Sequence, residues 1–280
     1  LAKLFVQKKE YESGLEQYQK AIQIYPGFEK AHLERGSLYE QMGKTALAEE
    51  GYRHMLKEAS MEHEEAGLRL VHLLIQRGDL DDATTILDRL LQEDPENPDL
   101  LLKHSLIWSE RKEFARAIDP LRKVISLRPQ SLELTLYLAS LYEEMADYSN
   151  ALLTYQEALK KEGDLYPVHL RLGALYFYHF KKIPEALSEG ERAKAVDPKR
   201  PEAYLFTGLI LHESQKFEEA AEHLEEGVET APNRPDLHFH LGIAYDKLGR
   251  FEALVREMER TIALDPSHAM ALNYLGYTYA

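Results

Sequence analysis

Residues 242–258 read GIAYDKLGRFEALVREM, and the same pattern recurs in three other places along the chain. Residues 36–52 read GSLYEQMGKTALAEEGY, residues 139–155 read ASLYEEMADYSNALLTY, and residues 208–224 read GLILHESQKFEEAAEHL. Prolines mark the same period at spacings of 69, 34, 69, 34 and 34 residues, namely Pro26, Pro95, Pro129, Pro198, Pro232 and Pro266. A fixed period near 34 residues indicates an array of one small structural unit.

Each copy of the pattern predicts a helix, a turn and a second helix. A small residue such as Gly242 is followed three positions later by a large one such as Tyr245, and residues three apart share one face of a helix. Gly43, Gly78 and Gly249 then stand where the end of a helix favours the left-handed backbone conformation. The first position of the next helix, where a missing N–H costs nothing, is taken by Pro98, Pro201 and Pro235.

Two places depart from this regular pattern. Pro120 falls inside a predicted second helix, where proline costs about 3 kcal/mol or kinks the helix. The stretch YFYHFKKIPEA, residues 176–186, carries one residue more than the corresponding stretch of the other repeats. Both departures are read as local adjustments of an otherwise regular array.

The 34-residue helix–turn–helix pattern closely resembles the tetratricopeptide repeat (TPR) family, and the resemblance covers essentially the whole chain. It implies an all-α fold, a superhelical solenoid of tandem helix pairs, as a single array over residues 1–280. Full repeats are predicted over 29–63, 64–97, 98–131, 132–165, 166–200, 201–234 and 235–268. A half repeat over 1–28 and a partial repeat over 269–280 predict that the chain is an excerpt of a longer protein. The closing ALNYLGYTYA is similar to a segment common in bacterial TPR proteins, which predicts a bacterial origin.

In the TPR family the first helices of successive repeats line a concave groove, so the resemblance implies which positions face a partner. The fifth and ninth positions of these helices are mostly apolar, and an apolar ladder of this length favours an interaction surface. Interior packing of the same leucines between adjacent first helices stays an alternative. The predicted partner-binding residues are Leu68, Leu102, Leu106, Leu136, Leu170, Phe177, Tyr178, Leu205, Leu209, Phe239, His240 and Ile243.

Acidic residues flank this ladder on both sides. Glu202 and Asp236 represent the second position of the first helices, and Glu213 and Asp246 represent their far ends. Because opposite charges set register and association rate, the predicted partner is a protein or peptide segment with apolar anchors and basic flanks. Self-association through apolar ends of the array is a further prediction.

The charge balance excludes other partners. With 34 Lys and Arg against 48 Asp and Glu, the formal net charge is −14, so the chain lacks the basic footprint that nucleic-acid binding requires. The same charge disfavours anionic membrane surfaces. No apolar run approaches the roughly 18 residues that a membrane-spanning helix needs, so direct membrane insertion is not expected.

The sequence predicts no catalytic residues, no metal and no cofactor. Cysteine is absent, which excludes thiolate ligands and cysteine nucleophiles. His238 and His240 are two residues apart on a helix, so their side chains point about 200° from each other and do not share one metal. His238 is predicted to pack in the interior, and His240 is predicted to face the groove. The GKT at 43–45 lacks the glycine that a phosphate-binding loop has five residues earlier, because position 38 is leucine.

The function that this pattern predicts is a non-catalytic scaffold for protein–protein interaction. The alternative is the recruitment or assembly arm of a larger enzyme, or of an envelope-anchored protein of export or polysaccharide assembly, because both ends fall within a repeat. The compartment is left open between the cytoplasm and the periplasm or cell envelope.

Overall fold

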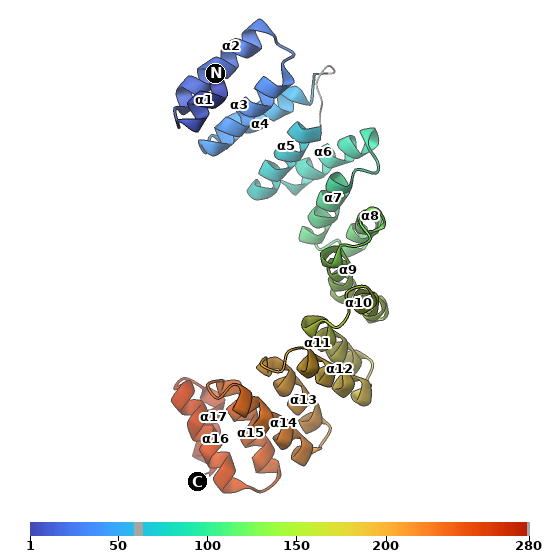
Figure 1. The fold of residues 1–280 in the computed structure, drawn as a ribbon, viewed down its shortest axis with the longest axis vertical. Helices are drawn as coiled ribbons and strands as arrows, with labels where there is room; N and C mark the ends of the chain where they lie inside the picture. Colours follow the sequence, from blue (N-terminus) through green and yellow to red (C-terminus); the bar gives the residue numbers. More distant parts are fainter. Residues whose placement is uncertain (59–63, 279–280) are drawn as a thin grey trace. The chain divides into compact units, whose positions relative to one another are not determined.

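The computed structural model describes residues 1–58 and 64–278, and these residues form helices and no strands. The predicted all-α fold is therefore confirmed. The chain, coloured along its sequence in Figure 1, divides into two compact units, Leu1–Met145 and Ala146–Ala280. The last residues of the predicted repeat 29–63 and the last two of the partial repeat 269–280 lie outside the described residues.

Unit 1 is a stack of helices in chain order. Its helices are α1 (Ala2–Gln7), α2 (Tyr11–Ile24), α3 (Glu29–Gln41), α4 (Thr45–Met55), α5 (Glu64–Arg77), α6 (Leu80–Glu93), α7 (Pro98–Glu110), α8 (Phe114–Leu127) and α9 (Leu132–Glu144). The pairs α3 with α4, α5 with α6 and α7 with α8 each fall within one predicted repeat, and each pair packs on the next. One core cluster extends from α4 to α7 and a second lies between α2 and α3, as expected when a helix pair cannot bury its apolar faces alone.

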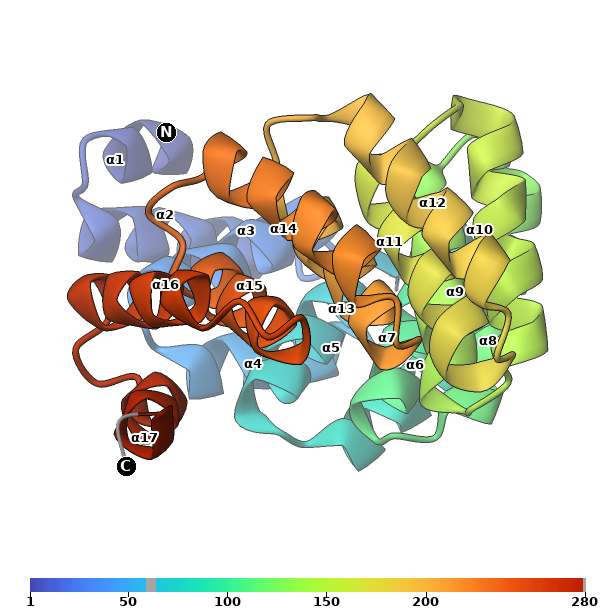
Figure 2. The ribbon, with the colours of Figure 1, turned by 90° about the horizontal axis from the view of Figure 1, so that it is seen from below.

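Unit 2 is built in the same way. It contains α10 (Tyr148–Glu162), α11 (Tyr166–Ala174), the π-helix η1 (Leu175–His179), α12 (Ile183–Val196), α13 (Pro201–Glu213), α14 (Phe217–Thr230), α15 (Pro235–Lys247), α16 (Phe251–Leu264) and α17 (Ala269–Thr278). The strongest contacts join α11 to α12, α13 to α14 and α15 to α16. The first helices α13 and α15 also contact each other directly (Figure 2).

Prolines bound the helices as the sequence predicts. Pro98, Pro201 and Pro235 are the first residues of α7, α13 and α15. Six second helices, α2, α6, α8, α12, α14 and α16, end two residues before a proline; α14, for example, ends at Thr230 and is followed by Pro232. Pro120 lies inside α8, also as predicted. Helix boundaries were therefore readable because proline fixes φ and removes a donor.

Small residues bring the two helices of a pair into close contact. A Cβ added to Gly208 on α13 would lie 2.6 Å from Cγ of Leu224 on α14, closer than real Cβ atoms come to other atoms. A Cβ on Gly242 of α15 would lie 2.8 Å from Cε of Met258 on α16. The predicted role of these glycines in close helix packing is confirmed.

The turns between first and second helices adopt the left-handed conformation. Gly43, Gly78 and Gly249 have φ of 70°, 82° and 68° there, which confirms the predicted role of these glycines. The same conformation occurs at five residues that are not glycine: Lys9, Lys112, Ala146, Lys181 and Gln215, with φ between 55° and 63°. The repeat geometry imposes this conformation, and an L-residue with a Cβ adopts it at a cost of roughly 1–2 kcal/mol.

Replacing Gln215 or Lys112 by glycine should therefore stabilise the chain. Glycine removes the cost of placing a Cβ in the left-handed conformation, but its greater freedom in the unfolded state cancels part of that benefit. The net gain in the free energy of unfolding should be about 1 kcal/mol. Gly249→Ala should lower that free energy by about 1 kcal/mol or more. Urea unfolding followed by circular dichroism measures both. Glu222→Gly, on the exposed face inside α14, is the control of opposite sign and should cost about 1 kcal/mol; stabilisation there, or none at Gln215, would contradict the argument.

The extra residue of the stretch 176–186 is absorbed within the first helix of its repeat. Residues Leu175–His179 form a π-helix that continues α11, and the Phe180 N–H donates to the Leu175 carbonyl five residues earlier, at 3.2 Å. A single π-turn accommodates one additional residue and redirects the side chains that follow, and such turns are frequent at functional sites. The aromatic residues of this segment consequently leave the regular register of the first helices.

Three histidines occupy the same register position in the repeat core. His32, His169 and His238 are buried on α3, α11 and α15. His238 Nδ1 lies 2.6 Å from Oε2 of Glu257, and its Nε2 donates to the Pro232 carbonyl at 3.0 Å. Burial lowers the pKa of His238, but these hydrogen bonds outweigh burial and raise its pKa above the usual value. The predicted structural role of His238 is confirmed.

Candidate partner-binding surface

The predicted apolar ladder is half-buried rather than open. Its fifth-position leucines are partly covered by the core of their own unit; Leu68 packs against the core around α5 and α6, and Leu170 packs against Tyr166, Ala193 and Ala203. Six of the predicted residues line neither hollow described below. Leu106 is exposed, and the other five are half-buried, namely Leu68, Leu102, Leu136, Leu170 and Leu205. The leucines thus take part in interior packing as well as facing outward.

Unit 2 brings the other predicted residues into two hollows. The small hollow, about 430 Å³, lies between η1 and α13 and contains three of them: Phe177, Tyr178 and Leu209. Tyr178 is 58% exposed at its rim. The remaining lining residues of the small hollow are Lys181, Phe206, Ile210 and Glu213.

The large hollow, about 1050 Å³, lies over α15, the start of α16, and α17. Three predicted residues line it, and Phe239 is only 5% exposed there because it also packs against Met258 and Ala271. Its rim is strongly apolar, with Tyr277 84% exposed. The full lining is Phe239, His240, Ile243, Asp246, Phe251, Met270, Asn273, Tyr274, Tyr277 and Thr278.

Sequence reasoning missed several residues that line the two hollows. Phe206 and Tyr274 stand at the sixth position of their helices, the same register position as the predicted His240. The recurrence of aromatic residues at this position was the available signal. Phe251 carried no such signal, because it begins a second helix and reaches the large hollow only through the packing of α16 beside α15.

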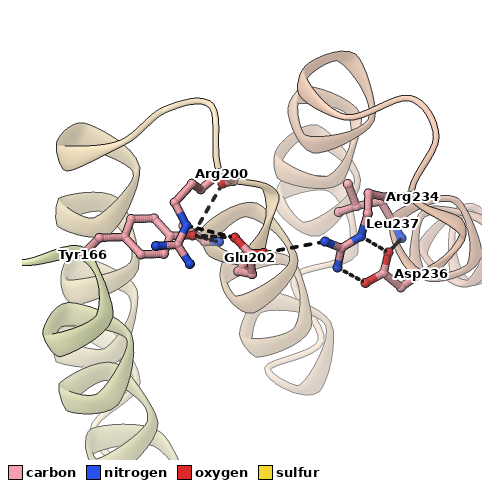
Figure 3. A network of polar contacts seen from close by, with 7 residues as sticks. Tyr166, Arg200, Glu202, Arg234, Asp236 and Leu237 are labelled. Atoms are coloured by element: carbon pink, nitrogen blue, oxygen red, sulfur yellow. Dashed lines mark hydrogen bonds and ion pairs between the residues drawn. The ribbon is translucent and has the colours of Figure 1, made fainter. Parts of the chain in front are cut away.

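The predicted acidic flank at the helix starts is already neutralised within the chain. In Figure 3, Arg234 binds Asp236 at 2.6 Å and also lies 3.6 Å from Glu202 on the neighbouring first helix. Arg200 binds Glu202 at 3.4 Å and stacks 3.9 Å above the ring of Tyr166, whose hydroxyl donates to Glu202 at 3.3 Å. Arg234 holds the pKa of Asp236 below its usual value against the opposing effect of burial. Burial likewise raises the pKa of Glu202, but the backbone N–H of Glu202 and the Arg200 guanidinium outweigh it and lower that pKa.

Unit 1 shows the same neutralisation. Glu65 binds Arg69 at 3.2 Å, and Asp99 binds Arg128 at 2.9 Å. The prediction that acidic residues on both sides of the ladder attract a basic partner is therefore weakened at the helix starts, because arginines of the same chain already bind these carboxylates. Sequence reasoning missed this because Arg128, Arg200 and Arg234 come from the turns that precede first helices. Arg69 lies one helical turn after Glu65 on α5 itself.

In unit 2, the carboxylates at the far ends of the first helices differ in their ion pairing from the carboxylates at the helix starts. Among the residues that the structure describes, Glu213 and Asp246 form no ion pair. Glu213 is exposed beside the small hollow, and Asp246 is half-buried in the large one. Each of the two hollows of unit 2 thus carries a carboxylate that is available to a partner.

The formal charge in the large hollow is the carboxylate of Asp246. The Tyr274 hydroxyl donates to Oδ2 of Asp246 at 2.6 Å, and burial together with this hydrogen bond raises the pKa of Tyr274 to about 12. Burial also lowers the pKa of His240, which therefore stays neutral near pH 7. The carboxylate of Asp246 is consequently the dominant electrostatic feature of an otherwise apolar, aromatic hollow.

Neither a metal centre nor a membrane span is found in the described part of the chain. No three histidine or acidic side chains converge as metal ligands within residues 1–58 and 64–278. None of the described helices is both long enough and apolar enough to cross a bilayer. His238 and His240 face different surroundings, since His238 binds Glu257 and His240 lines the large hollow.

Paired helices that repeat every 34 or 35 residues and pack only on their chain neighbours define a helical-repeat protein. Family models agree with this class: one described as tetratricopeptide repeat matches residues 52–105, and one described as TPR repeat matches residues 2–43 and 208–249. Together with the fold, these matches show that the chain is a tetratricopeptide repeat protein. Its predicted bacterial origin is not confirmed by them.

Named relatives and solved structures are similar to parts of the chain. DnaJ homolog subfamily C member 3 of Bos taurus is 26% identical over 196 residues, covering 65% of this chain and 37% of that protein. The BBSome complex member BBS4 homolog of Drosophila melanogaster is 22% identical over 173 residues, covering 62% of this chain and 36% of that protein. The chain thus matches little more than a third of the length of these relatives.

Solved structures of TPR proteins share the fold. The C-terminal part of a TPR repeat-containing protein from Cytophaga hutchinsonii superposes with a TM-score of 0.62 at 16% identity, over 76% of this chain and 87% of that one. YrrB, described as a TPR protein with an unusual peptide-binding site, superposes with a TM-score of 0.52 at 19% identity, over 68% of this chain and 97% of that one. At these identities the likeness shows the fold alone.

Proposed function

We propose that this chain is a non-catalytic scaffold. It binds a polypeptide segment of a partner protein along the face of its first helices that carries the predicted partner-binding residues, which is called their outward face. The observation that carries the proposal is the pair of hollows in unit 2, both on the outward face of first helices and both lined by aromatic and aliphatic side chains. Exposed aromatic side chains such as Tyr178 and Tyr277 are typical interface anchors. The peptide-binding site named for YrrB supports the same class of function.

The partner segment proposed here has apolar anchors and basic residues near them. Apolar side chains fit the two hollows, and basic side chains are attracted to the unpaired carboxylates Glu213 and Asp246. Basic flanks at the helix starts are less favoured than the sequence suggested, because Arg200 and Arg234 already neutralise the carboxylates there. Charge complementarity of this kind sets orientation and association rate.

A second candidate is the recruitment arm of a larger protein, an enzyme or an envelope-anchored assembly protein. The relatives that the chain matches are longer than the matched part, which favours this candidate without distinguishing its two forms. The same surface would serve in both cases. Expression of the full-length gene product, with a test for any further domain in it, separates a free scaffold from a recruitment arm.

Peptide selection tests the proposed surface. A random peptide library displayed on phage is panned against the chain, and the affinity of enriched peptides is measured by fluorescence anisotropy. The groove variant combines Tyr178→Ala, Phe251→Ala and Tyr277→Ala, all exposed, so it should keep its helicity and lose affinity by about tenfold or more.

The matched control removes equally exposed apolar side chains elsewhere. Tyr25→Ala, Leu127→Ala and Leu153→Ala together change residues that lie on or just after second helices. This control variant should bind the selected peptides as tightly as the unmodified chain does. Retention of binding by the groove variant, or its loss in the control variant, would contradict the proposed surface.

A further inference from the structure

Two tyrosines of unit 2 link neighbouring first helices through a carboxylate. Tyr166 on α11 donates to Glu202 on α13 at 3.3 Å, and Tyr274 on α17 donates to Asp246 on α15 at 2.6 Å. At the first pair an arginine completes the arrangement: Arg200 binds the carboxylate at 3.4 Å and lies 3.9 Å over the tyrosine ring (Figure 3). At the second pair no described side chain forms an ion pair with Asp246.

Other tyrosine–carboxylate pairs in the chain also have a basic side chain beside them. Glu40 accepts from Tyr52 and lies 3.6 Å from Arg69. Tyr245 donates to Glu225 at 2.6 Å, and Arg250 lies 5.9 Å from its ring. Glu202 and Glu40 each have an arginine within 3.6 Å, whereas Asp246 has the same hydrogen bond from a tyrosine but no ion pair with any described residue.

The surroundings of Asp246 favour the binding of a guanidinium over that of an anion, an apolar side chain or an ammonium. The large hollow has one formal negative charge, so an anion is repelled, and a purely apolar side chain would leave the half-buried carboxylate without a counterion. Aromatic rings of Phe239, Phe251 and Tyr277 line the same space. A guanidinium pairs with carboxylates through two parallel hydrogen bonds and stacks on aromatic faces, whereas an ammonium offers only a point charge.

We propose that the large hollow receives an arginine side chain of the partner segment, whose guanidinium pairs with Asp246 and stacks on the surrounding aromatic rings. This proposal rests on the proposed function, because the arginine is presented by the segment bound to the outward face of the first helices. It extends that function by naming the residue type that the hollow selects. Arg200 on Tyr166 and Glu202 is the intramolecular precedent in the same unit.

The selected peptides supply the test. Peptides enriched on the unmodified chain should share an arginine, and its replacement by citrulline, which keeps the shape and removes the charge, should weaken binding by about tenfold or more. Asp246→Asn keeps an acceptor for the Tyr274 hydroxyl and should abolish the preference for arginine over citrulline. Glu213→Gln is the matched control: it removes the other unpaired carboxylate, at the small hollow, and should leave that preference intact.

The outcomes separate the two proposals. If peptides are selected and depend on the groove residues but show no arginine preference, the arginine site is wrong and the scaffold function stands. If Glu213→Gln rather than Asp246→Asn removes the preference, arginine binds at the small hollow and the assignment is overturned. If no peptide binds and sedimentation shows a dimer that Asp246→Asn dissociates, the occupant is a second copy of the chain; if nothing binds at all, both proposals fail.

Discussion

Substitution of His169 by leucine is expected to lower the free energy of unfolding by about 3 kcal/mol or more. His169 is fully buried on α11; its Nδ1 lies 2.6 Å from Oε2 of Glu189 on α12, and its Nε2 lies 3.2 Å from Oδ1 of Asp164. The change leaves Glu189, whose side chain is only 10% exposed, without its main partner. Removing one member of a buried pair costs about 3–5 kcal/mol, and Arg192, at 3.2 Å from Glu189, keeps the loss near the lower end.

Chemical denaturation followed by circular dichroism measures this loss. The informative control is the double substitution His169→Leu with Glu189→Met, which removes the buried charge together with its partner. Replacing a buried pair by apolar residues of similar volume is often neutral, so the double variant should recover most of the stability. A single variant that loses less than about 1 kcal/mol, or a double variant less stable than the single one, would show that the pair is not coupled.

Trp108→Ala is expected to lower the free energy of unfolding of unit 1 by about 3–5 kcal/mol. Trp108 is 3% exposed on α7, its Nε1–H donates to Nε2 of His104 at 3.0 Å, and the guanidinium of Arg116 lies 3.3 Å from its ring centre. Truncation removes the largest aromatic side chain of this region and leaves a cavity between α7 and α8. Trp108→Phe keeps a ring in the same place and should cost clearly less.

This prediction also distinguishes the two units. Trp108 is the only tryptophan of the chain and lies in unit 1, so its fluorescence in the unmodified protein reports the unfolding of that unit. Helicity lost in the Trp108→Ala variant should come first from unit 1, which hydrogen exchange resolved by peptide fragments would locate. Earlier exchange in residues of unit 2, such as those of α13, would contradict the assignment.

Most of the fold followed from local signals. Proline marks the end of the second helices, and glycine with a positive φ marks the turn inside a pair, because each residue type has its own backbone restriction. At Lys112 and Gln215 the same left-handed turn occurs without that signal. There the packing of the two flanking helices imposes a conformation that the residue itself disfavours, so only the repeat register, and not the residue type, could have predicted it.

The candidate site was less accessible from the sequence. His238 was expected to be structural, yet its partner could not be assigned, because Glu257 lies on the following second helix, 19 residues away. Glu189 stands in the same relation to His169, 20 residues away. Phe177 and Tyr178 were expected near the groove, whereas Phe251 was not, because its place in the large hollow depends on how α16 packs beside α15. The roles of Phe177 and Tyr178 in partner binding stay predictions.

The sequence by itself determined the periodicity of the chain, the helix pairs and the position of each residue within its repeat, because these depend on backbone preferences and on apolar spacing over a few turns. The tertiary structure decided which charges remain available. Glu202 and Asp236 occupy the acidic positions that the sequence predicted, but Arg200 and Arg234 neutralise them. Asp246 accepts a hydrogen bond from Tyr274 and forms no ion pair with the residues that the structure describes. Ion pairing and exposure depend on distances between side chains of different repeats, and those distances are set only when the repeats pack together.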